Sequence, residues 1–246
     1  MGKCDIPLRT LQNFVDHLYK KIKPDFIIWT GDNPSHTEWK KENQEESINV
    51  TKIFSNMLLE KNKEYNITIP VYPAMGNHEK FPIDQFFPFD KNTEKNLLKK
   101  IASSWKNFLT EEAYNSFIEN GFYTQMHLKT NLRIICYNSL LIDILNFYLL
   151  KNTNDPNGQI IWLENVLSEA EKNKEIVYLI GHIPIADVTF NSESSKRYQI
   201  LLDRYSDIIR GNFAGHTHFD EVKIMREYYN ENKTTGMVYI APSLTT

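Results

Sequence analysis

The sequence predicts a single α/β domain, and three observations support this. Helical and strand-like segments alternate along the chain, which is the arrangement found in α/β folds. Short apolar runs at residues 26–29 and 176–180 are typical of buried strands. A length of 246 residues with 41% hydrophobic residues suits one large domain with a sizeable core.

The helices are predicted from apolar residues that recur at helical spacing. Such spacing covers residues 7–22, 45–59, 97–108, 110–120 and 159–171. Pro24 ends the first of these helices, because proline cannot continue one. Gly121 is expected to close the helix at 110–120 in the left-handed conformation.

The strands are predicted from short apolar runs bounded by turn residues. They cover residues 26–29, 69–74, 122–126, 132–137, 176–180 and 208–213. Residues 222–228 and 237–241 are expected to pair as a hairpin around 230–236.

The bulk composition excludes several classes of protein. A net charge of −3 gives no basic face, so no nucleic acid partner is expected. No apolar run approaches the ~20 residues of a membrane span, and no signal peptide opens the chain. Two cysteines, Cys4 and Cys136, are too few for a disulfide framework.

The chemistry concentrates where buried strands end. Four apolar strands each run into a glycine and then into possible ligands: Gly31-Asp32, Gly76-Asn77-His78-Glu79, Gly181-His182 and Gly215-His216-Thr217-His218. Sites in open α/β sheets lie at the carboxyl ends of strands, and glycine permits the sharp turn that lets side chains converge there. Taken singly, each of these segments is more often a simple turn or a hydrogen-bonded histidine. The four together favour a metal site.

Divalent cations suit this set of side chains. A carboxylate can bridge two cations, while imidazole nitrogens and an amide oxygen complete each shell. Two cations ~3.5–4 Å apart can clamp a phosphate and activate water. The remaining histidines, His17 and His127, follow no such glycine and are expected to be structural.

These motifs resemble the calcineurin-like metallophosphoesterase superfamily, and finer detail resembles its branch of acid sphingomyelinases and acid sphingomyelinase-like phosphodiesterases. The detail lies in residues 3–10, 29–36, 146–150, 153–156, 159–163, 181–184 and 241–246. The resemblance covers essentially the whole chain. It implies an α/β/β/α sandwich, with two central mixed sheets flanked by helices.

The resemblance also assigns roles to individual residues. Asp32 matches the carboxylate that bridges two metals. Asn77, His182 and His216 match the other ligands of the second metal, and His218 matches a ligand of the first. His78 and His36 match the catalytic histidines beside the scissile phosphate, where a histidine can donate a proton.

One family motif has no counterpart here. The family opens with Asp-x-His on its first strand, and the adjacent Asp16-His17 lies on a predicted helix and cannot replace it. The first strand is therefore expected to be missing, and residues 1–246 to form one catalytic domain that is incomplete at both ends. The first metal would keep only Asp32 and His218. Cys4 resembles a half-cystine whose partner lies upstream, whereas Cys136 is expected to be a core thiol.

By resemblance the function is the two-metal hydrolysis of sphingomyelin to ceramide and phosphocholine. Zinc is the expected metal, and a membrane surface is where the substrate is expected to be met. Two alternatives stay open: a phosphodiesterase of nucleotides or other soluble diesters, and a truncated non-catalytic paralogue that binds metal or lipid. The family setting is lysosomal or extracellular. There the sequons at Asn49, Asn66 and Asn232 would be glycosylated. The sequence does not indicate an oligomeric state.

Overall fold

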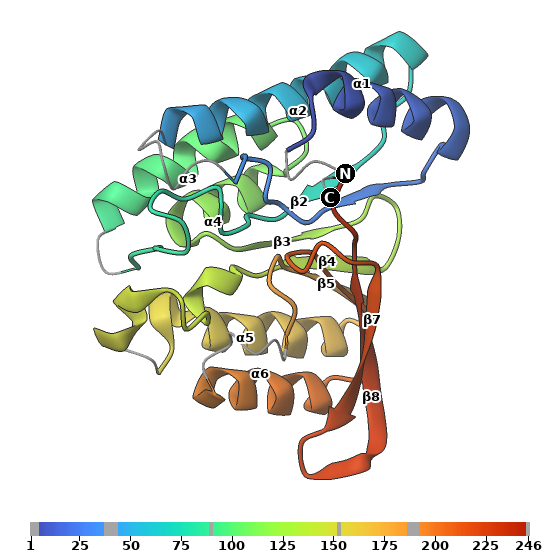
Figure 1. Ribbon diagram of the computed structural model, residues 1–246. Helices are drawn as coiled ribbons and strands as arrows, with labels where there is room; N and C mark the ends of the chain where they lie inside the picture. The colour runs from blue at the N-terminus through green and yellow to red at the C-terminus, as the bar shows by residue number, and fades with distance from the viewer. Residues whose placement is uncertain (1–4, 37–43, 89–90, 152–153, 186–191, 245–246) are drawn as a thin grey trace.

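The computed structural model describes residues 5–36, 44–88, 91–151, 154–185 and 192–244. Two β-sheets lie face to face in the middle of the molecule, and a layer of helices covers the outer face of each (Figure 1). This is the layered arrangement that the alternation of helices and strands predicts.

The smaller sheet carries two of the four glycine motifs. It consists of β1 (Ile27–Trp29) and β2 (Val71–Pro73), which run parallel. Four helices cover it: α1 (Leu8–His17), α2 (Gln44–Tyr65), α3 (Lys91–Trp105) and α4 (Glu111–Asn120). Thr110 caps α4 by accepting a hydrogen bond from the amide of Ala113, and Gly121 ends it at φ 80°, as predicted.

The larger sheet has six strands in the order β3-β4-β5-β6-β8-β7. They are β3 (Tyr123–Met126), β4 (Leu132–Cys136), β5 (Ile176–Ile180), β6 (Ile209–Ala214), β7 (Glu221–Glu227) and β8 (Asn230–Ile240). Neighbours from β4 to β8 are parallel, while β3 and β7 are antiparallel edge strands. Helices α5 (Gln159–Lys172) and α6 (Ser192–Arg204) cover its outer face.

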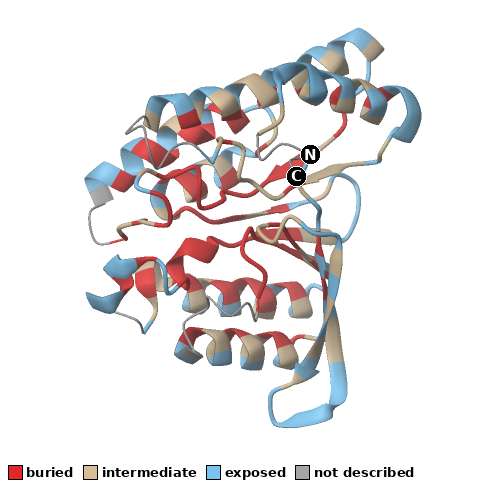
Figure 2. Cartoon of the chain, viewed as in Figure 1, coloured by how far each residue is buried: buried red, intermediate tan, exposed pale blue. Residues whose placement is uncertain are grey.

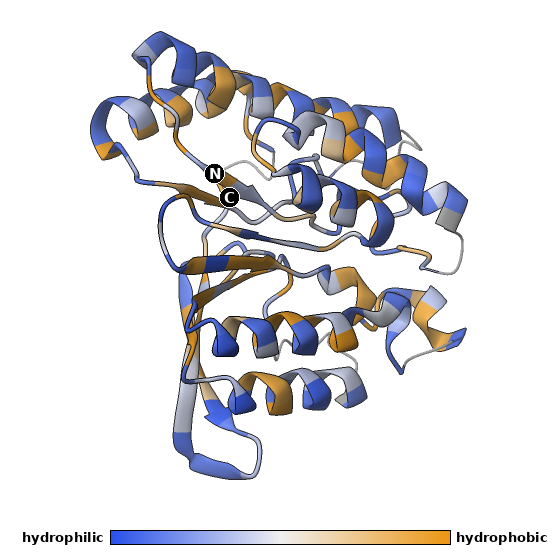
Figure 3. Ribbon diagram, turned by 180° about the vertical axis from the view of Figure 1, so that it is seen from behind, coloured by the Kyte–Doolittle hydropathy of each residue, from blue (hydrophilic) through white to orange (hydrophobic). Residues whose placement is uncertain are grey.

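The core fills the space between the sheets and beneath the helices. Figure 2 shows the buried residues on the strands and on the inward faces of the helices. Figure 3 shows the same division in hydropathy, with hydrophobic strands inside and hydrophilic helix faces outside. Contacts such as Tyr123 Oη to the carbonyl of Pro73, at 2.9 Å, join the two sheets and fix their strand ends relative to one another.

Several expectations from the sequence need correction. Helix α6 was not predicted, because its sequence is mostly polar and buries few apolar side chains, chiefly Tyr198 and Leu202. The hairpin turns at residues 228–229 instead of 230–236, since the polar residues 230–236 extend β8 as a two-stranded ribbon with β7. Only the larger sheet is mixed; the described part of the smaller sheet is purely parallel.

The remaining differences concern element ends. The first predicted helix continues beyond α1 as one π-helical turn, Leu18–Ile22, while α2 runs further than predicted and α3 begins earlier. Short 3-10 turns at Ser139–Leu141, Phe147–Lys151 and Pro156–Gly158 were not predicted. Among the described helices, none is both long and apolar enough to cross a bilayer.

Candidate metal centre

The four glycine motifs meet at one edge of the sandwich. Asp32 follows β1, Asn77 and His78 follow β2, His182 follows β5, and His216 follows β6. Because β1 and β2 are parallel to each other, and β5 to β6, each pair delivers its side chains at the same end. The prediction that these strand ends converge is confirmed for Asp32, His182 and His216, whose ligand atoms lie within 4.8 Å of one another.

His182 is oriented as metal-binding histidines are. Its Nδ1 lies 2.8 Å from the carbonyl oxygen of Thr30 and donates to it, which leaves a lone pair on Nε2. The side chain is 1% exposed, and Nε2 has no hydrogen-bond partner among the described residues. Nε2 lies 3.2 Å from Oδ2 of Asp32. A buried ring nitrogen aimed at a carboxylate in this way fits a shared cation.

Asn77 and His216 add two donors to this pair. Oδ1 of Asn77 lies 3.3 Å from Nδ1 of His216, and the rings of His182 and His216 are 5.2 Å apart at their centroids. The set is therefore one carboxylate, two imidazoles and one amide oxygen. These donors suit zinc and other divalent cations of similar character.

Asp32 sits in a strained turn that brings two loops into contact. Its own φ is 64°, and Oδ1 accepts a hydrogen bond of 2.8 Å from the amide of His78. A Cβ on Gly31 would lie 2.5 Å from the amide nitrogen of Gly76, and one on Gly76 would lie 2.6 Å from that of Asp32. Only glycine at both positions lets the loops approach this closely.

Asp32 and the histidines beside it change one another's pKa values. Burial alone would raise the pKa of Asp32, but the nearby His182 and His78 outweigh it and hold that pKa below its ordinary value. Burial alone would lower the pKa of His182, and the Asp32 carboxylate raises it instead. Asp32 is thus held as the carboxylate, the form that binds a cation.

Glu79 ties the two loops together, a role that the sequence did not reveal. Its carboxylate accepts from the amides of Asp32, Asn33 and Gly76 at 2.9, 2.8 and 2.6 Å, and from Nδ2 of Asn33 at 2.6 Å. Burial and then the charge of Asp32 raise the pKa of Glu79. Because all four of these groups donate, a proton on either oxygen would face a donor, so the geometry holds Glu79 ionised. Its position in the Gly76-Asn77-His78-Glu79 motif was the available signal.

The other predicted site histidines form a neighbouring cluster. The ring of His36 lies 4.7 Å from that of His78 and 5.1 Å from that of His218, measured between centroids. Nε2 of His78 is 4.0 Å from Oδ2 of Asp32, so this cluster borders the cation donors. Burial, and then the charge of His36, lower the pKa of His218. The structure places His218 beside His36, outside the trio of Asp32, His182 and His216.

Asp5 orients His36, and the sequence analysis assigned it no role. Its Oδ1 lies 2.8 Å from Nδ1 of His36, and its Oδ2 accepts from the amide of His36 at 3.2 Å. A carboxylate oxygen only accepts, so Nδ1 of His36 donates to Asp5 and Nε2 faces away from it.

The residues given structural roles behave as predicted. Nδ1 of His127 is 2.7 Å from Oη of Tyr72, away from the metal donors, and Asp16 pairs with Lys20 and Lys61. Cys136 is buried as a core thiol, and burial raises its pKa. Cys4 lies outside the described residues, so its predicted half-cystine role stays a prediction.

Comparison with known proteins agrees with the geometry. The calcineurin-like phosphoesterase family matches residues 4–220. Sphingomyelin phosphodiesterase A of Dictyostelium discoideum is 35% identical over 99% of this chain and 41% of its own length. The sphingomyelin phosphodiesterase of Bos taurus is 34% identical over 100% and 38%, respectively. The chain thus spans about two fifths of the length of these relatives.

Two further proteins are similar to this chain, one in sequence and one in structure. The cyclic GMP-AMP phosphodiesterase of Bos taurus is 33% identical over 98% of this chain and 53% of its own length. A dimetal phosphatase from Danio rerio has a similar structure, with a TM-score of 0.55 and 12% identity, over 96% of this chain and 78% of that one. Divalent metals are implied by the family, and Asp32, His182 and His216 form a possible site for one. The chain belongs to the calcineurin-like phosphoesterase family.

Proposed function

We propose that this protein hydrolyses phosphodiesters with the help of two divalent cations, and that its substrate is sphingomyelin. Zinc is the proposed metal. The observation that carries the proposal is the convergence of Asp32, His182 and His216, with the His36–His78 pair beside them. The proposed products are ceramide and phosphocholine. The 34% identity to a sphingomyelin phosphodiesterase supports this choice of substrate.

The proposed ligand assignment combines the geometry of Asp32, His182 and His216 with the roles that the family resemblance gives to Asn77 and His218. Asp32, Asn77, His182 and His216 hold one cation, and Asp32 and His218 contribute to a second. Bound there, the cations supply charge that polarises the phosphoryl oxygens and lowers the pKa of water. The family's Asp-x-His motif, which would complete the shell of the cation at Asp32 and His218, has no counterpart in residues 1–246.

The histidine cluster supplies the proton. Water adds to phosphorus while the bond from phosphorus to the ceramide oxygen breaks, and that oxygen must gain a proton. His78 and His36 are the proposed donors, because His78 borders Asp32, His36 lies beside His78, and neither belongs to the trio around the cation. The carboxylate of Asp5 holds His36 in place for this role.

A second candidate substrate class is supported by one observation. The cyclic GMP-AMP phosphodiesterase is 33% identical to this chain, close to the value for the sphingomyelin phosphodiesterases. The same site is therefore a candidate for hydrolysis of soluble nucleotide diesters. The shape of the substrate pocket decides between them, because the metal chemistry is common to both.

The test compares two substrates on zinc-loaded protein. Phosphocholine release from sphingomyelin vesicles is measured beside cleavage of a cyclic dinucleotide, with His17→Ala as the control for a histidine outside the site. Preferential release of phosphocholine supports the proposal, and preferential cleavage of the dinucleotide supports the second candidate. Zinc binding without either activity would favour the non-catalytic paralogue.

The cellular setting is proposed on the same basis. We infer a lysosomal or extracellular location, with substrate met at a membrane surface, from the sphingomyelin phosphodiesterase relatives. The sequon residues Asn49, Asn66 and Asn232 are exposed, which suits glycosylation. Expression through a secretory pathway, followed by glycosidase treatment, tests this by the change in mass.

A further inference from the structure

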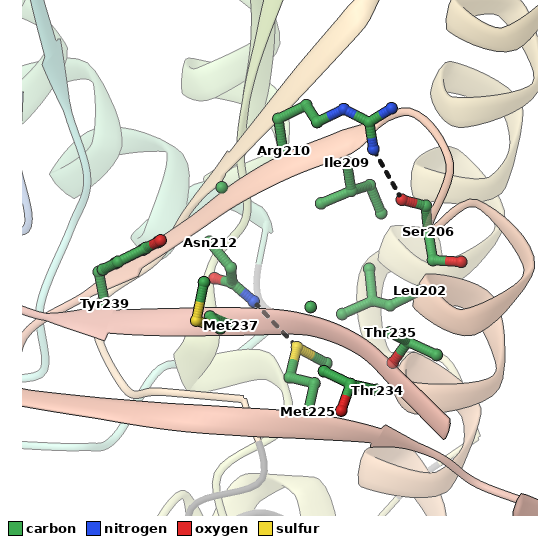
Figure 4. Close-up of a pocket in the computed structure, with 12 residues that line it drawn as sticks. Leu202, Ser206, Ile209, Arg210, Asn212, Met225, Thr234, Thr235, Met237 and Tyr239 are labelled. Atoms are coloured by element: carbon green, nitrogen blue, oxygen red, sulfur yellow. Dashed lines mark hydrogen bonds between the residues drawn. The ribbon is translucent and has the colours of Figure 1, made fainter. Parts of the chain in front are cut away.

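A hollow lies on the outer face of the larger sheet, between α6, β6 and β8. It has a volume of about 290 Å³. Figure 4 shows Leu202 of α6 and Ser206 beyond its end, with Ile209 and Asn212 on β6 and Met225 on β7. Asn212 lies within β6, whereas His216 lies beyond the end of that strand, and the described residues that line the hollow include none of the proposed metal donors. The hollow is therefore separate from the metal centre.

Two irregularities in strand pairing open onto this hollow. Val177 pairs with Ile209 and Tyr178 pairs with Gly211, so Arg210 is an extra residue in β6. On the facing ribbon, Met225 pairs with Gly236 and Arg226 pairs with Thr234, so Thr235 is an extra residue in β8. Bulges re-aim side chains and are common beside binding sites. Both extra residues line the same hollow.

The hollow contains polar atoms without partners. Asn212 is 1% exposed, and its Oδ1 has no hydrogen-bond partner among the described residues. The Oγ1 atom of Thr235 is also buried and has no partner among them. Nδ2 of Asn212 makes only a weak contact of 4.0 Å with Sδ of Met225. Buried polar atoms are rarely left unpaired in folded proteins. The volume is several times the ~30 Å³ that one water molecule occupies in the liquid, so a partner larger than water fits.

The lining also indicates the charge of that partner. Arg210 stands at the mouth, where Nη1 donates to the carbonyl of Ser206 at 3.4 Å. No acidic side chain occurs among the described residues that line the hollow. Leu202, Ile209 and Met225 supply apolar walls between Arg210 and the buried Asn212.

We propose that this hollow binds a small amphipathic organic anion. Its carboxylate pairs with Arg210, its apolar or aromatic body packs against Leu202 and Met225, and a hydroxyl at its far end donates to Oδ1 of Asn212. Arg210 and Asn212 are two residues apart, roughly 6.6 Å along a strand, which suits groups at opposite ends of a six-membered ring. This proposal does not depend on the phosphodiesterase function.

The test titrates 4-hydroxyphenylacetate into the full chain, labelled with ¹³C on the methionine methyl groups. We expect saturable shifts of the Met225 resonance and none at Met57 or Met126, which lie elsewhere. Arg210→Gln should weaken binding of the acid about tenfold but leave its methyl ester within about twofold. Asn212→Leu should weaken binding of the acid about tenfold, and binding of phenylacetate, which has no hydroxyl, much less.

Controls and contrary results are equally specific. Arg226→Gln removes a cation from the neighbouring strand, outside the lining, and should leave binding unchanged. Arg210 is exposed, so Arg210→Gln keeps the test valid even if Asn212→Leu fails to fold. The proposal is overturned if Met225 shows no saturable shift up to about 10 mM probe, a range that covers even weak ligands. It is also overturned if Arg210→Gln binds the acid as the unmodified protein does.

Discussion

The two groups of histidines at the strand ends differ in how firmly they are held. His182 is 1% exposed, and a hydrogen bond from Nδ1 to Thr30 fixes its ring. His36, in contrast, has a side chain that is 48% exposed and is held by the carboxylate of Asp5. A buried, fixed ring suits the binding of a cation, whereas an accessible ring suits proton exchange with substrate. The comparison separates binding from chemistry within one site.

The largest effect is expected from Asp32→Asn, which acts on both groups. Asn keeps the shape of the side chain but removes the charge that faces His182 and His78. Turnover of a phosphodiester should fall by roughly 10³-fold or more, and zinc affinity should fall with it. Steady-state kinetics and a zinc titration of the same preparation measure both. Unchanged turnover would remove Asp32 from the proposed ligand set.

His78→Ala should affect the chemistry alone. Loss of a proton donor typically lowers turnover by about 10²–10⁴-fold, while the donors to the cation stay in place. We expect the zinc content, measured by elemental mass spectrometry, to be normal and kcat to be low. His17→Ala, on the exposed face of α1, is the matched control. A His78→Ala protein that loses its zinc would place His78 among the ligands instead.

Glu79→Gln should weaken cation binding, although Glu79 is not a proposed ligand of the cation. Glutamine keeps only one oxygen, so some of the four N–H donors around Glu79 would face an NH₂ group. The loops of Asp32 and Asn77 should then shift, and zinc affinity should fall about 10–100-fold. Isothermal titration with zinc measures this. Retention of full affinity would show that the two loops hold their positions without Glu79.

The smallest effect is expected from Glu175→Gln, which lies away from both groups. Nη2 of Arg133 lies 3.0 Å from Oε1 of Glu175, and the hydrogen bond from Arg133 lowers the pKa of Glu175. A lowered carboxylate pKa stabilises the fold above the unfolded pKa, and that stability is lost as pH falls through the folded pKa. The variant should unfold about 1 kcal/mol more easily at pH 7, but scarcely more easily at a pH below the folded pKa.

Denaturant unfolding at both pH values checks this, and zinc affinity should not change. A difference in stability of the same size at both pH values would show that the ion pair is not its cause. The variant also serves as the control for Glu79→Gln, because it removes a buried glutamate charge that has no contact with the metal donors.

Three candidate metal donors could be predicted from local sequence patterns, whereas some of the elements around them could not. Asp32, His182 and His216 were identifiable because each follows an apolar strand and a glycine, a local pattern that fixes both chemistry and position. Helix α6 and the ribbon at residues 230–236 were mispredicted, since tertiary packing overrode weak local preferences there.

Other features depend on contacts that sequence spacing does not encode. Glu79 acts through amides 46 and 47 residues away, and Asp5 reaches His36 across 31 residues. The hollow beneath α6 depends on two bulges in different strands, and no local sequence pattern predicts either bulge.

The proposed function depends on Asp32, Asn77, His182 and His216 holding one divalent cation together. Diffraction from a zinc-soaked crystal at the zinc absorption edge would locate that cation. We expect an anomalous peak about 2.0–2.2 Å from one oxygen of Asp32, Oδ1 of Asn77, Nε2 of His182 and a ring nitrogen of His216. Zinc bound elsewhere, with these four side chains left as hydrogen-bonding partners of one another, would contradict it.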